Sequence, residues 1–517
     1  MSMWIHFKEL CIVLIASAIT FALGKSFALA YATFEEFSNR KRLWYLISVI
    51  AFLSPNPWVL IVLSVPILIF VGRKDANPVA LFAFLLNVIP QIFLANITMG
   101  SHKLFEITTY RVLIVTLLLP LFLNLRQKSA TNKNKWIQSI DVLIVAWIIL
   151  QVAIYIPPDL ADQSMLEDSM TNMLRRAFLL FFDVYLLYYV TSRYCSNTKK
   201  LKEVIAFYSL GILCMSLIAT IEFLKHWLLY ADIVTDLSTV QQHTVYLIRN
   251  GVVRARAAAS HSLVLGYLIV LSLSFWLYFR TTLPSTSSRK VISFIYLFGL
   301  LATYSRGPWA GSVVVVVGYA ALQPQGLFRA IQVSFLILGV GLLLVISPFG
   351  GMVSQVVPFL GGKVDVGNIV YRQQLFDEAW SLIKENPFLG DPTAYLRMQD
   401  MRQGEGIIDL VNSYLQMALY YGLVGLFLFV SPMLLSIREV LRVAKLSRPY
   451  DKDFALLGVS IAAAILGSLF MISSISFMPG LAEAYYLLCA FSVAYARIHQ
   501  SASEGHSHSP VGRTSLG

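Results

Sequence analysis

The stretch that decides the fold runs from Leu300 to Ala320 and reads LLATYSRGPWAGSVVVVVGYA. It is apolar and long enough to cross a bilayer, but the polar run Ser305-Arg306-Gly307-Pro308 interrupts it. Proline has no N–H to donate and fits the first turn of a helix. The stretch therefore predicts one helix that ends near Thr303 and a second helix that begins near Gly307.

Arg306 lies at this break, next to the free N–H groups that begin the second helix. A guanidinium beside the positive end of a helix dipole forms an anion site that suits phosphate. We therefore predict that Arg306 binds a phosphate group. The alternative is that Arg306 only marks the helix end and extends its side chain to the membrane interface.

The charge pattern around the break favours the anion site. No Asp or Glu occurs from Leu237 to Val364. Arg249, Arg254, Arg256 and Arg306 all fall in this span. Arginines without acidic neighbours near a membrane usually have a ligand or a distant partner. Glu222 and Glu483 are the candidate distant partners.

The composition is that of a membrane protein. Of the 517 residues, 57% are hydrophobic and only 13% are charged, which is too apolar for a soluble globular chain. The net charge of +12 does not indicate nucleic-acid binding, because the basic residues gather in short loops between apolar segments. We predict an all-α polytopic transmembrane helical bundle of about 12 to 15 spans.

Loop charge predicts the orientation and the domain organisation. Lys and Arg cluster in alternate loops, so these loops are expected to be cytoplasmic and the longest loop external. One of the predicted spans covers 78–97. The predicted parts are N-terminal transmembrane helices with the broken helix over 1–347, an external loop over 348–409, C-terminal transmembrane helices over 410–498 and a disordered tail over 499–517.

The large external loop contains an amphipathic helix, predicted over 368–385 and stopped by Asn386-Pro387. Its predicted apolar stripe consists of Ile369, Phe376, Ala379, Trp380 and Ile383. Arg372 stands four residues before Phe376 and so falls on this stripe. We predict that Arg372 is a second anion ligand beside Arg306. The alternatives are a helix cap or a buried pair with a distant acid.

Polar residues mark the beginning of the next span. Asp409, Asn412, Ser413 and Gln416 recur at spacings of three and four, so they are predicted to share one helix face. The alternative is that they cap the helix. The chain contains no phosphate-binding Gly-x-x-x-x-Gly-Lys loop and no His-Glu-x-x-His pair. ATP hydrolysis and zinc proteolysis therefore have no support, and no metal or cofactor is predicted.

Several spaced motifs between about 250 and 440 together resemble the O-antigen ligase and polymerase superfamily of bacterial inner-membrane proteins. The motifs are Tyr304-Ser305-Arg306-Gly307-Pro308-Trp309-Ala310, the helix from Arg372 through Trp380 to Asn386-Pro387-Phe388-Leu389-Gly390, Asn412-Ser413-Tyr414-Leu415-Gln416 with Gly422 and Gly425, and Arg254-Ala255-Arg256 with His261-Ser262. The resemblance implies a GT-C-like bundle in the bacterial cell inner membrane with a periplasmic large loop.

The resemblance also implies a metal-independent glycosyltransferase without a cofactor. Such an enzyme moves glycan from an undecaprenyl-diphosphate-linked oligosaccharide to an acceptor sugar on the external face of the membrane. Its partners are that substrate, membrane lipid and other polysaccharide-assembly proteins, with no nucleic acid. Arginines neutralise the leaving diphosphate and a base takes the proton of the acceptor hydroxyl. Arg306 and Arg372 are the preferred diphosphate ligands, followed by Arg254 and Arg256.

One position departs from the pattern. Ligases of the superfamily usually carry His immediately before the Asn of the Asn-x-Tyr-Leu motif, and here Val411 precedes Asn412. The candidate bases are then Asp409, Glu405 and His261, unless positioning and leaving-group stabilisation suffice. Asn412 is predicted to be catalytic together with Asp409 and His261. His261 is alternatively a packed interface residue.

The missing histidine favours a polymerase of exopolysaccharide or O-antigen repeats over an O-antigen ligase that transfers glycan to lipid A core. Two other functions compete with an enzyme. One is a lipid-linked oligosaccharide flippase or transporter, and the other is a noncatalytic assembly partner. A flippase is expected to line a central cavity with charge at many depths, whereas here the charges are predicted to cluster on one face.

Overall fold

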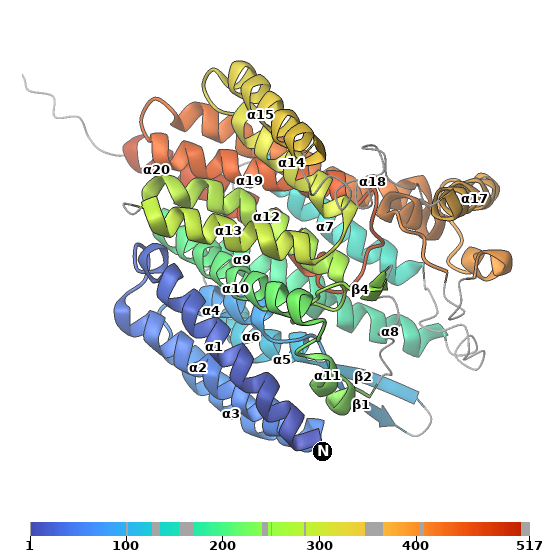
Figure 1. Cartoon of the computed structure of the whole chain (residues 1–517). Coiled ribbons are helices and arrows are strands. Elements are labelled where there is room, and N and C mark those ends of the chain that lie inside the picture. Colours follow the sequence, from blue (N-terminus) through green and yellow to red (C-terminus); the bar gives the residue numbers. More distant parts are fainter. Residues whose placement is uncertain are drawn as a thin grey trace, which may run out of the picture.

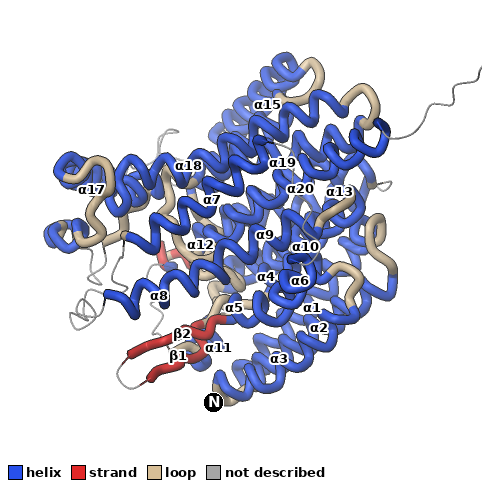
Figure 2. The backbone as a smooth tube through the Cα atoms, turned by 180° about the vertical axis from the view of Figure 1, so that it is seen from behind, coloured by secondary structure: helices blue, strands red, loops and turns tan. Residues whose placement is uncertain are grey.

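The computed structural model describes residues 2–99, 102–126, 135–154, 169–239, 247–249, 251–283, 286–346, 366–402 and 408–507, and the structural statements below concern these residues. They form a bundle of roughly aligned helices (Figure 1). The helix α17 and a β-hairpin lie at one end of the bundle, on the right of Figure 1. Figure 2 shows the same arrangement from behind.

The helices of the first half are α1 (Ser2–Ala28), α2 (Phe34–Leu53), α3 (Pro57–Lys74), α4 (Pro78–Val88), α5 (Thr109–Leu113), α6 (Leu119–Arg126), α7 (Lys135–Ala153), α8 (Ser169–Leu180), α9 (Leu187–Tyr194), α10 (Thr198–Lys225) and α11 (Ala231–Leu237). Two π-helical turns, η1 (Ile114–Leu118) and η3 (Phe181–Leu186), connect α5 to α6 and α8 to α9. The antiparallel strand pairs are β1 (Phe93–Met99) with β2 (His102–Thr108), and β3 (Ile248–Arg249) with β4 (Val252–Val253).

The helices of the second half are α12 (Ser262–Thr282), α13 (Thr286–Ala302), α14 (Arg306–Ala321), α15 (Gly326–Ile346), α17 (Val366–Glu385), α18 (Ser413–Ser447), α19 (Lys452–Met471) and α20 (Leu481–Ser507). Two 3-10 turns, η6 (Ala394–Arg397) and η7 (Gln399–Met401), follow α17. The helix α18 contains one non-helical residue, Gly422, where it bends.

Eight of the described helices are long and apolar enough to cross a membrane: α1, α3, α7, α10, α12, α18, α19 and α20. This confirms the expected all-α multi-pass membrane protein. Shorter apolar helical stretches occur at Pro78–Val88, Thr109–Leu125 and Gly326–Gly341. Several of the 12 to 15 segments expected from the sequence are therefore present as pieces too short to count as full spans.

Buried helices hold the broken helix in place. The helix α10 is buried along most of its length and packs against α1, α4, α12 and α13. The helix α14 packs against α12 and α19, and α19 in turn packs against α18. The junction between α13 and α14 is therefore fixed from both sides, because each helix has its own buried neighbour.

The structure corrects two predictions of local structure. The span predicted over 78–97 ends as helix α4 at Val88, and strand β1 begins at Phe93. Pro90 explains the change, because it cannot donate a helical hydrogen bond and favours extended backbone in the residue before it. The tail predicted to be disordered from 499 is helical up to Ser507, where His499 Nδ1 lies 3.2 Å from Ser447 Oγ of α18. Residues 508–517 lie outside the described residues.

Candidate functional site

The break predicted from the sequence is present. The helix α13 ends at Ala302 and α14 begins at Arg306, with Ser305 at the N-cap. The turn between them has Tyr304 at φ 46°, a left-handed conformation. The N-cap side chain makes no capping hydrogen bond to α14; Ser305 Oγ instead donates to the carbonyl oxygen of Thr303 at 2.8 Å. The first turn of α14 therefore has no side-chain cap beside Arg306, which is half-buried.

Arg254 lies against this break. Its guanidinium donates to Ser305 Oγ at 2.7 Å and to the carbonyl oxygen of Thr303 at 3.4 Å. The backbone of the next residue, Ala255, donates to the carbonyl oxygen of Ala302 at 3.0 Å. The structure thus brings the segment that carries Arg254 to the residue that precedes Arg306. We call residues 254–261 the arginine loop; it follows β4, toward the same end of the bundle as α17 (Figure 1).

The carboxylate of Glu222 holds the arginine loop by its backbone. Its Oε2 accepts from the amides of Arg256 and Ala257 at 3.0 and 2.8 Å, and its Oε1 accepts from the amide of Leu229 at 2.9 Å. Burial lowers the pKa of the Arg256 guanidinium, and the nearby Glu222 carboxylate offsets only part of that shift. Glu222, one of the two acids considered as distant arginine partners, is therefore a loop anchor. The other, Glu483, accepts from Gln91 at 3.3 Å and from the amide of Gly480.

His261 ends the arginine loop as the N-cap of α12. Its Nδ1 accepts from the amide of Leu263 at 3.1 Å. Burial, together with the charges of Arg254 and Arg256, lowers the pKa of this imidazole to about 4. The ring is therefore neutral at pH 7, with its proton on Nε2. This geometry gives His261 a capping role, because the lone pair that a general base needs is already used.

A second loop, residues 472–480, connects the separated motifs. We call it the serine loop. Its Ser474 Oγ is close to Gly307, because a Cβ on that glycine would lie 2.8 Å from the hydroxyl. Its Pro479 carbonyl accepts from Ser260 Oγ of the arginine loop at 3.0 Å. A small cavity opens between the two loops, lined in part by Gln91, Ser260 and Gly480.

The serine loop also receives the start of α18. The amide of Ser413 donates to the carbonyl oxygen of Ile472 at 2.8 Å. The hydroxyl of Ser413 donates to the carbonyl oxygen of Ile475 at 2.6 Å. Gln416 Oε1 accepts from the amide of Phe477 at 2.7 Å. The arginine loop, the break and the polar start of α18 therefore meet around one short segment.

Asp409 is held by the same loop. Its Oδ1 accepts from the hydroxyl of Ser476 and from the amide of Val411 at 3.2 Å. The amide of Val411 also lies 2.9 Å from Ser476 Oγ. Asp409 precedes α18 and does not share a helix face with Ser413 and Gln416, which corrects that part of the prediction. The helix begins later because Val411 adopts φ 47°, a left-handed value that ends regular helix.

Asn412 is the N-cap of α18. Its Oδ1 accepts from the amides of Tyr414 and Leu415 at 3.0 and 3.3 Å. The capping alternative considered for this residue is therefore present in the structure. Glu405, the remaining candidate base, lies outside the described residues.

The amphipathic helix is present as α17, but its buried face differs from the prediction. The buried side chains are Leu375, Ala379, Leu382 and Ile383. Phe376 and Trp380 are 47% and 43% exposed and stack on each other. Arg372, one helical turn before Phe376, is exposed as well. The prediction that Arg372 lies on the docking face is therefore wrong. The predicted apolar stripe is shifted by about one residue from the helix face that packs against the bundle. The side chain of Ile369 lies outside the described residues.

Sequence reasoning missed the serine loop and one arginine. The loop carries Ser473, Ser474 and Ser476 before Pro479-Gly480, and this small polar run between two apolar spans was the available signal. Arg176 of α8 donates to the hydroxyl of Tyr421 at 2.8 Å and to the carbonyl oxygen of Gln151 at 2.9 Å. Arg176 directly precedes an apolar run, a position that is typical of arginines at the membrane interface.

An Asp-x-Asp pair of the kind that binds metal-nucleotide complexes occurs at Asp451-Lys452-Asp453. Both carboxylates have structural contacts. Asp451 caps α19 by accepting from the amide of Phe454 at 2.9 Å. Asp453 pairs with Lys202 and accepts from Tyr278 at 2.9 Å. These contacts account for the pair without a ligand.

Residues 291–430 match the family model described as O-Antigen ligase. The matched range contains the break at Arg306, the helix α17 and the start of α18. No curated protein matches the chain. The family match confirms the resemblance to the O-antigen ligase and polymerase superfamily and supports a function of that general type. Members of this family are glycosyltransferase-like enzymes, and the family implies lipid-linked oligosaccharide substrates.

Proposed function

We propose that this chain, with its O-antigen ligase-type domain, is a glycosyltransferase that polymerises undecaprenyl-diphosphate-linked oligosaccharide repeats into exopolysaccharide or O-antigen. The reaction takes place on the external face of the bacterial inner membrane, with α17 in the periplasm. Transfer requires neither a metal ion nor a cofactor. The observation that carries the proposal is the meeting of three motifs, the arginine loop, the Arg306 break and Asp409, around the serine loop.

The leaving group is a diphosphate, and its charge determines the binding groups. Arg306 binds it together with the positive end of the α14 dipole. Arg254, which donates to Ser305 beside Arg306, fixes the shape of the break and adds a second positive charge. Arg256 contributes charge from within the arginine loop. Arg372 meets the substrate from the exposed face of α17.

The acceptor hydroxyl attacks the anomeric carbon of the donor, the bond from that carbon to the diphosphate oxygen breaks, and the hydroxyl proton passes to a base. We assign Asp409 as that base. The hydrogen bonds from Ser476 and from the amide of Val411 both go to Oδ1, which orients Oδ2 toward the acceptor. Asn412 and His261 act as positioning residues, because each caps the helix that carries its motif.

Val411 supports the choice of polymerase. In the ligase pattern the base stands at this position, whereas here the backbone of Val411 orients Asp409 instead. The proposed base, Asp409, lies outside the Asn-x-Tyr-Leu motif, so the acceptor side of the site differs from the ligase pattern. The arginines of the donor side are retained. The second candidate function is an O-antigen ligase that transfers glycan to lipid A core, which the description of the matched family favours.

Purified protein in lipid vesicles tests the proposal. With a lipid-linked repeat unit as the sole substrate, and with no ATP, Mg²⁺ or Mn²⁺ added, a polymerase makes a ladder of longer lipid-linked products. A ligase leaves the repeat unit unchanged until lipid A core is added, and then forms only that conjugate. A strict requirement for ATP, Mg²⁺ or Mn²⁺ contradicts the proposed chemistry.

A further inference from the structure

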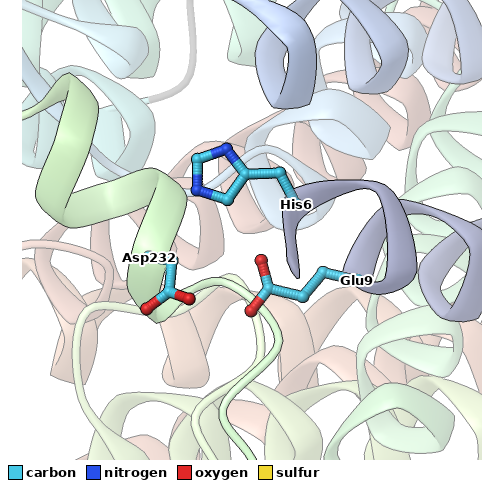
Figure 3. A group of neighbouring side chains, drawn as sticks. All are labelled: His6, Glu9 and Asp232. Atoms are coloured by element: carbon cyan, nitrogen blue, oxygen red, sulfur yellow. The ribbon is translucent and has the colours of Figure 1, made fainter. Parts of the chain in front are cut away.

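Two helices distant in sequence bring metal-ligating side chains together near the beginning of the chain (Figure 3). His6 and Glu9 come from the first turns of α1, and Asp232 comes from α11. One ligand atom of each residue lies within 4.8 Å of those of the other two. Asp236, one turn after Asp232, adds a further carboxylate, whose Oδ2 lies 3.3 Å from His6 Nε2.

Glu9 is the member of this group that points to a ligand. Its side chain is 0% exposed, and neither carboxylate oxygen has a well-formed hydrogen bond among the described residues, apart from a weak contact with the Trp227 side chain. Figure 3 shows this carboxylate directed into the space that it shares with His6 and Asp232. Removing a carboxylate from water without a partner costs several kcal/mol. An acid in that position, within a candidate membrane span, is expected to serve a bound cation or a proton.

We propose that His6, Glu9 and Asp232 bind one divalent transition-metal ion, with zinc as the probe. Imidazole nitrogen with carboxylate oxygens suits Zn²⁺ and its neighbours, whereas Mg²⁺ and Ca²⁺ prefer oxygen ligands alone. His6 and Glu9 are three residues apart and so lie on one face of α1. Adjacent ligands on tetrahedral zinc are separated by about 3.4 Å, inside the 4.8 Å limit within which these ligand atoms lie.

The ion has a structural role. It joins α1 to α11, and α11 lies in the segment that leads from α10 to the arginine loop. Glu222 anchors this segment on both sides of α11, because its carboxylate accepts hydrogen bonds from the amides of Leu229 and Arg256. The metal thus fixes the segment at a second point without contacting the substrate. This role is independent of the proposed glycosyl transfer.

Metal binding by the purified full-length protein tests the proposal. The protein carries no affinity tag of histidines and has His506→Ala and His508→Ala, so that its tail does not bind metal. After chelation and dialysis, zinc titration is expected to fill about one tight site per chain, and cobalt in its place gives the visible absorption of a low-coordinate site. In Glu9→Gln, zinc affinity is expected to fall more than 100-fold, because even partners of metal ligands contribute 10- to 100-fold.

Two comparisons keep the test decisive. Asp377→Asn, an exposed acid on α17, serves as the matched control and retains wild-type zinc affinity. Asp232→Asn repeats the test at a partly exposed ligand if Glu9→Gln does not fold. Absence of a tight site in the wild type, or wild-type affinity in both ligand variants, overturns the proposal and leaves Glu9 as a buried protonated acid.

Discussion

Gly390 and Gly422 meet backbone to backbone, at the point where the segment after α17 crosses α18. A Cβ on Gly390 would lie 2.5 Å from the amide nitrogen of Gly422, and a Cβ on Gly422 would lie 2.2 Å from the carbonyl oxygen of Phe388. Both glycines have left-handed φ, 69° and 66°. Because α18 is interrupted here, the amides of Leu423 and Val424 are free to donate to the carbonyls of Pro387 and Phe388, at 2.8 and 3.2 Å. The helix α17 is thereby fastened to the bundle.

Gly422→Ala is expected to detach α17 from its place. The new methyl group would overlap the Phe388 carbonyl, and the left-handed φ adds about 1 kcal/mol or more of strain. We expect a lower melting temperature and faster proteolysis between α17 and α18. Gly318→Ala on α14 is the matched control, since its Cβ would lie 3.4 Å from the nearest side chain and a helical Gly→Ala change is favourable by about 1 kcal/mol. Equal proteolysis of the two variants would contradict the fastening role.

Asp409→Asn is expected to abolish chain elongation while donor binding is retained. A positioned base contributes about 10²- to 10⁴-fold to the rate, and the amide of asparagine cannot accept the proton. Ser476→Ala removes one of the two hydrogen bonds to Asp409 Oδ1, so kcat should fall by a smaller factor with KM unchanged. Steady-state kinetics with the lipid-linked repeat measures both effects. An Asp409→Asn variant of wild-type rate would remove this residue from the mechanism.

The buried imidazole of His261 predicts acid sensitivity. Its pKa is lowered to about 4 in the folded protein, against about 6.5 in an unfolded chain. The unfolded state therefore binds the proton first, and folded-state stability declines as the pH falls from 6.5 through 4, by up to about 3 kcal/mol. His261→Asn keeps an N-cap acceptor but does not titrate, so it should lose less stability than the wild type between pH 7 and pH 4. If the thermal stability of the wild type and of His261→Asn falls equally between pH 7 and pH 4, His261 does not cause this dependence.

Arg254→Lys separates charge from geometry at the break. Lysine keeps the positive charge, but it lacks the planar fork that reaches both Ser305 Oγ and the Thr303 carbonyl. We expect elongation to fall at least tenfold in the lysine variant and further in Arg254→Ala. If lysine restores full activity, Arg254 contributes only charge to the site.

The sequence was sufficient to predict the local features that depend on single residues. Pro308 predicted the break within one or two residues of where α13 ends and α14 begins, because a proline has few helical positions open to it. Apolar segment length predicted a multi-pass helical membrane protein, and Asn386-Pro387 predicted the end of α17. These features require no knowledge of distant contacts.

Features that depend on tertiary packing were not predictable in the same way. The hydrophobic pattern of α17 contains two apolar faces, and only the docking on α18 decides that Leu375 is buried while Trp380 is exposed. The role of Glu222 depends on a loop more than 25 residues further along the chain. The serine loop carries no motif of its own. Its importance comes from the three partners that fold onto it.

The central claim, that Arg306 binds the diphosphate of a lipid-linked donor, is tested most directly by chain elongation in reconstituted vesicles. Wild type, Arg306→Ala, Arg306→Lys and the control Arg329→Ala, an exposed arginine at the start of α15, are compared at equal protein levels with a labelled lipid-linked repeat. The account predicts normal ladders for wild type and Arg329→Ala, no ladder for Arg306→Ala and a much shorter one for Arg306→Lys. A ladder of wild-type length from Arg306→Ala would contradict it.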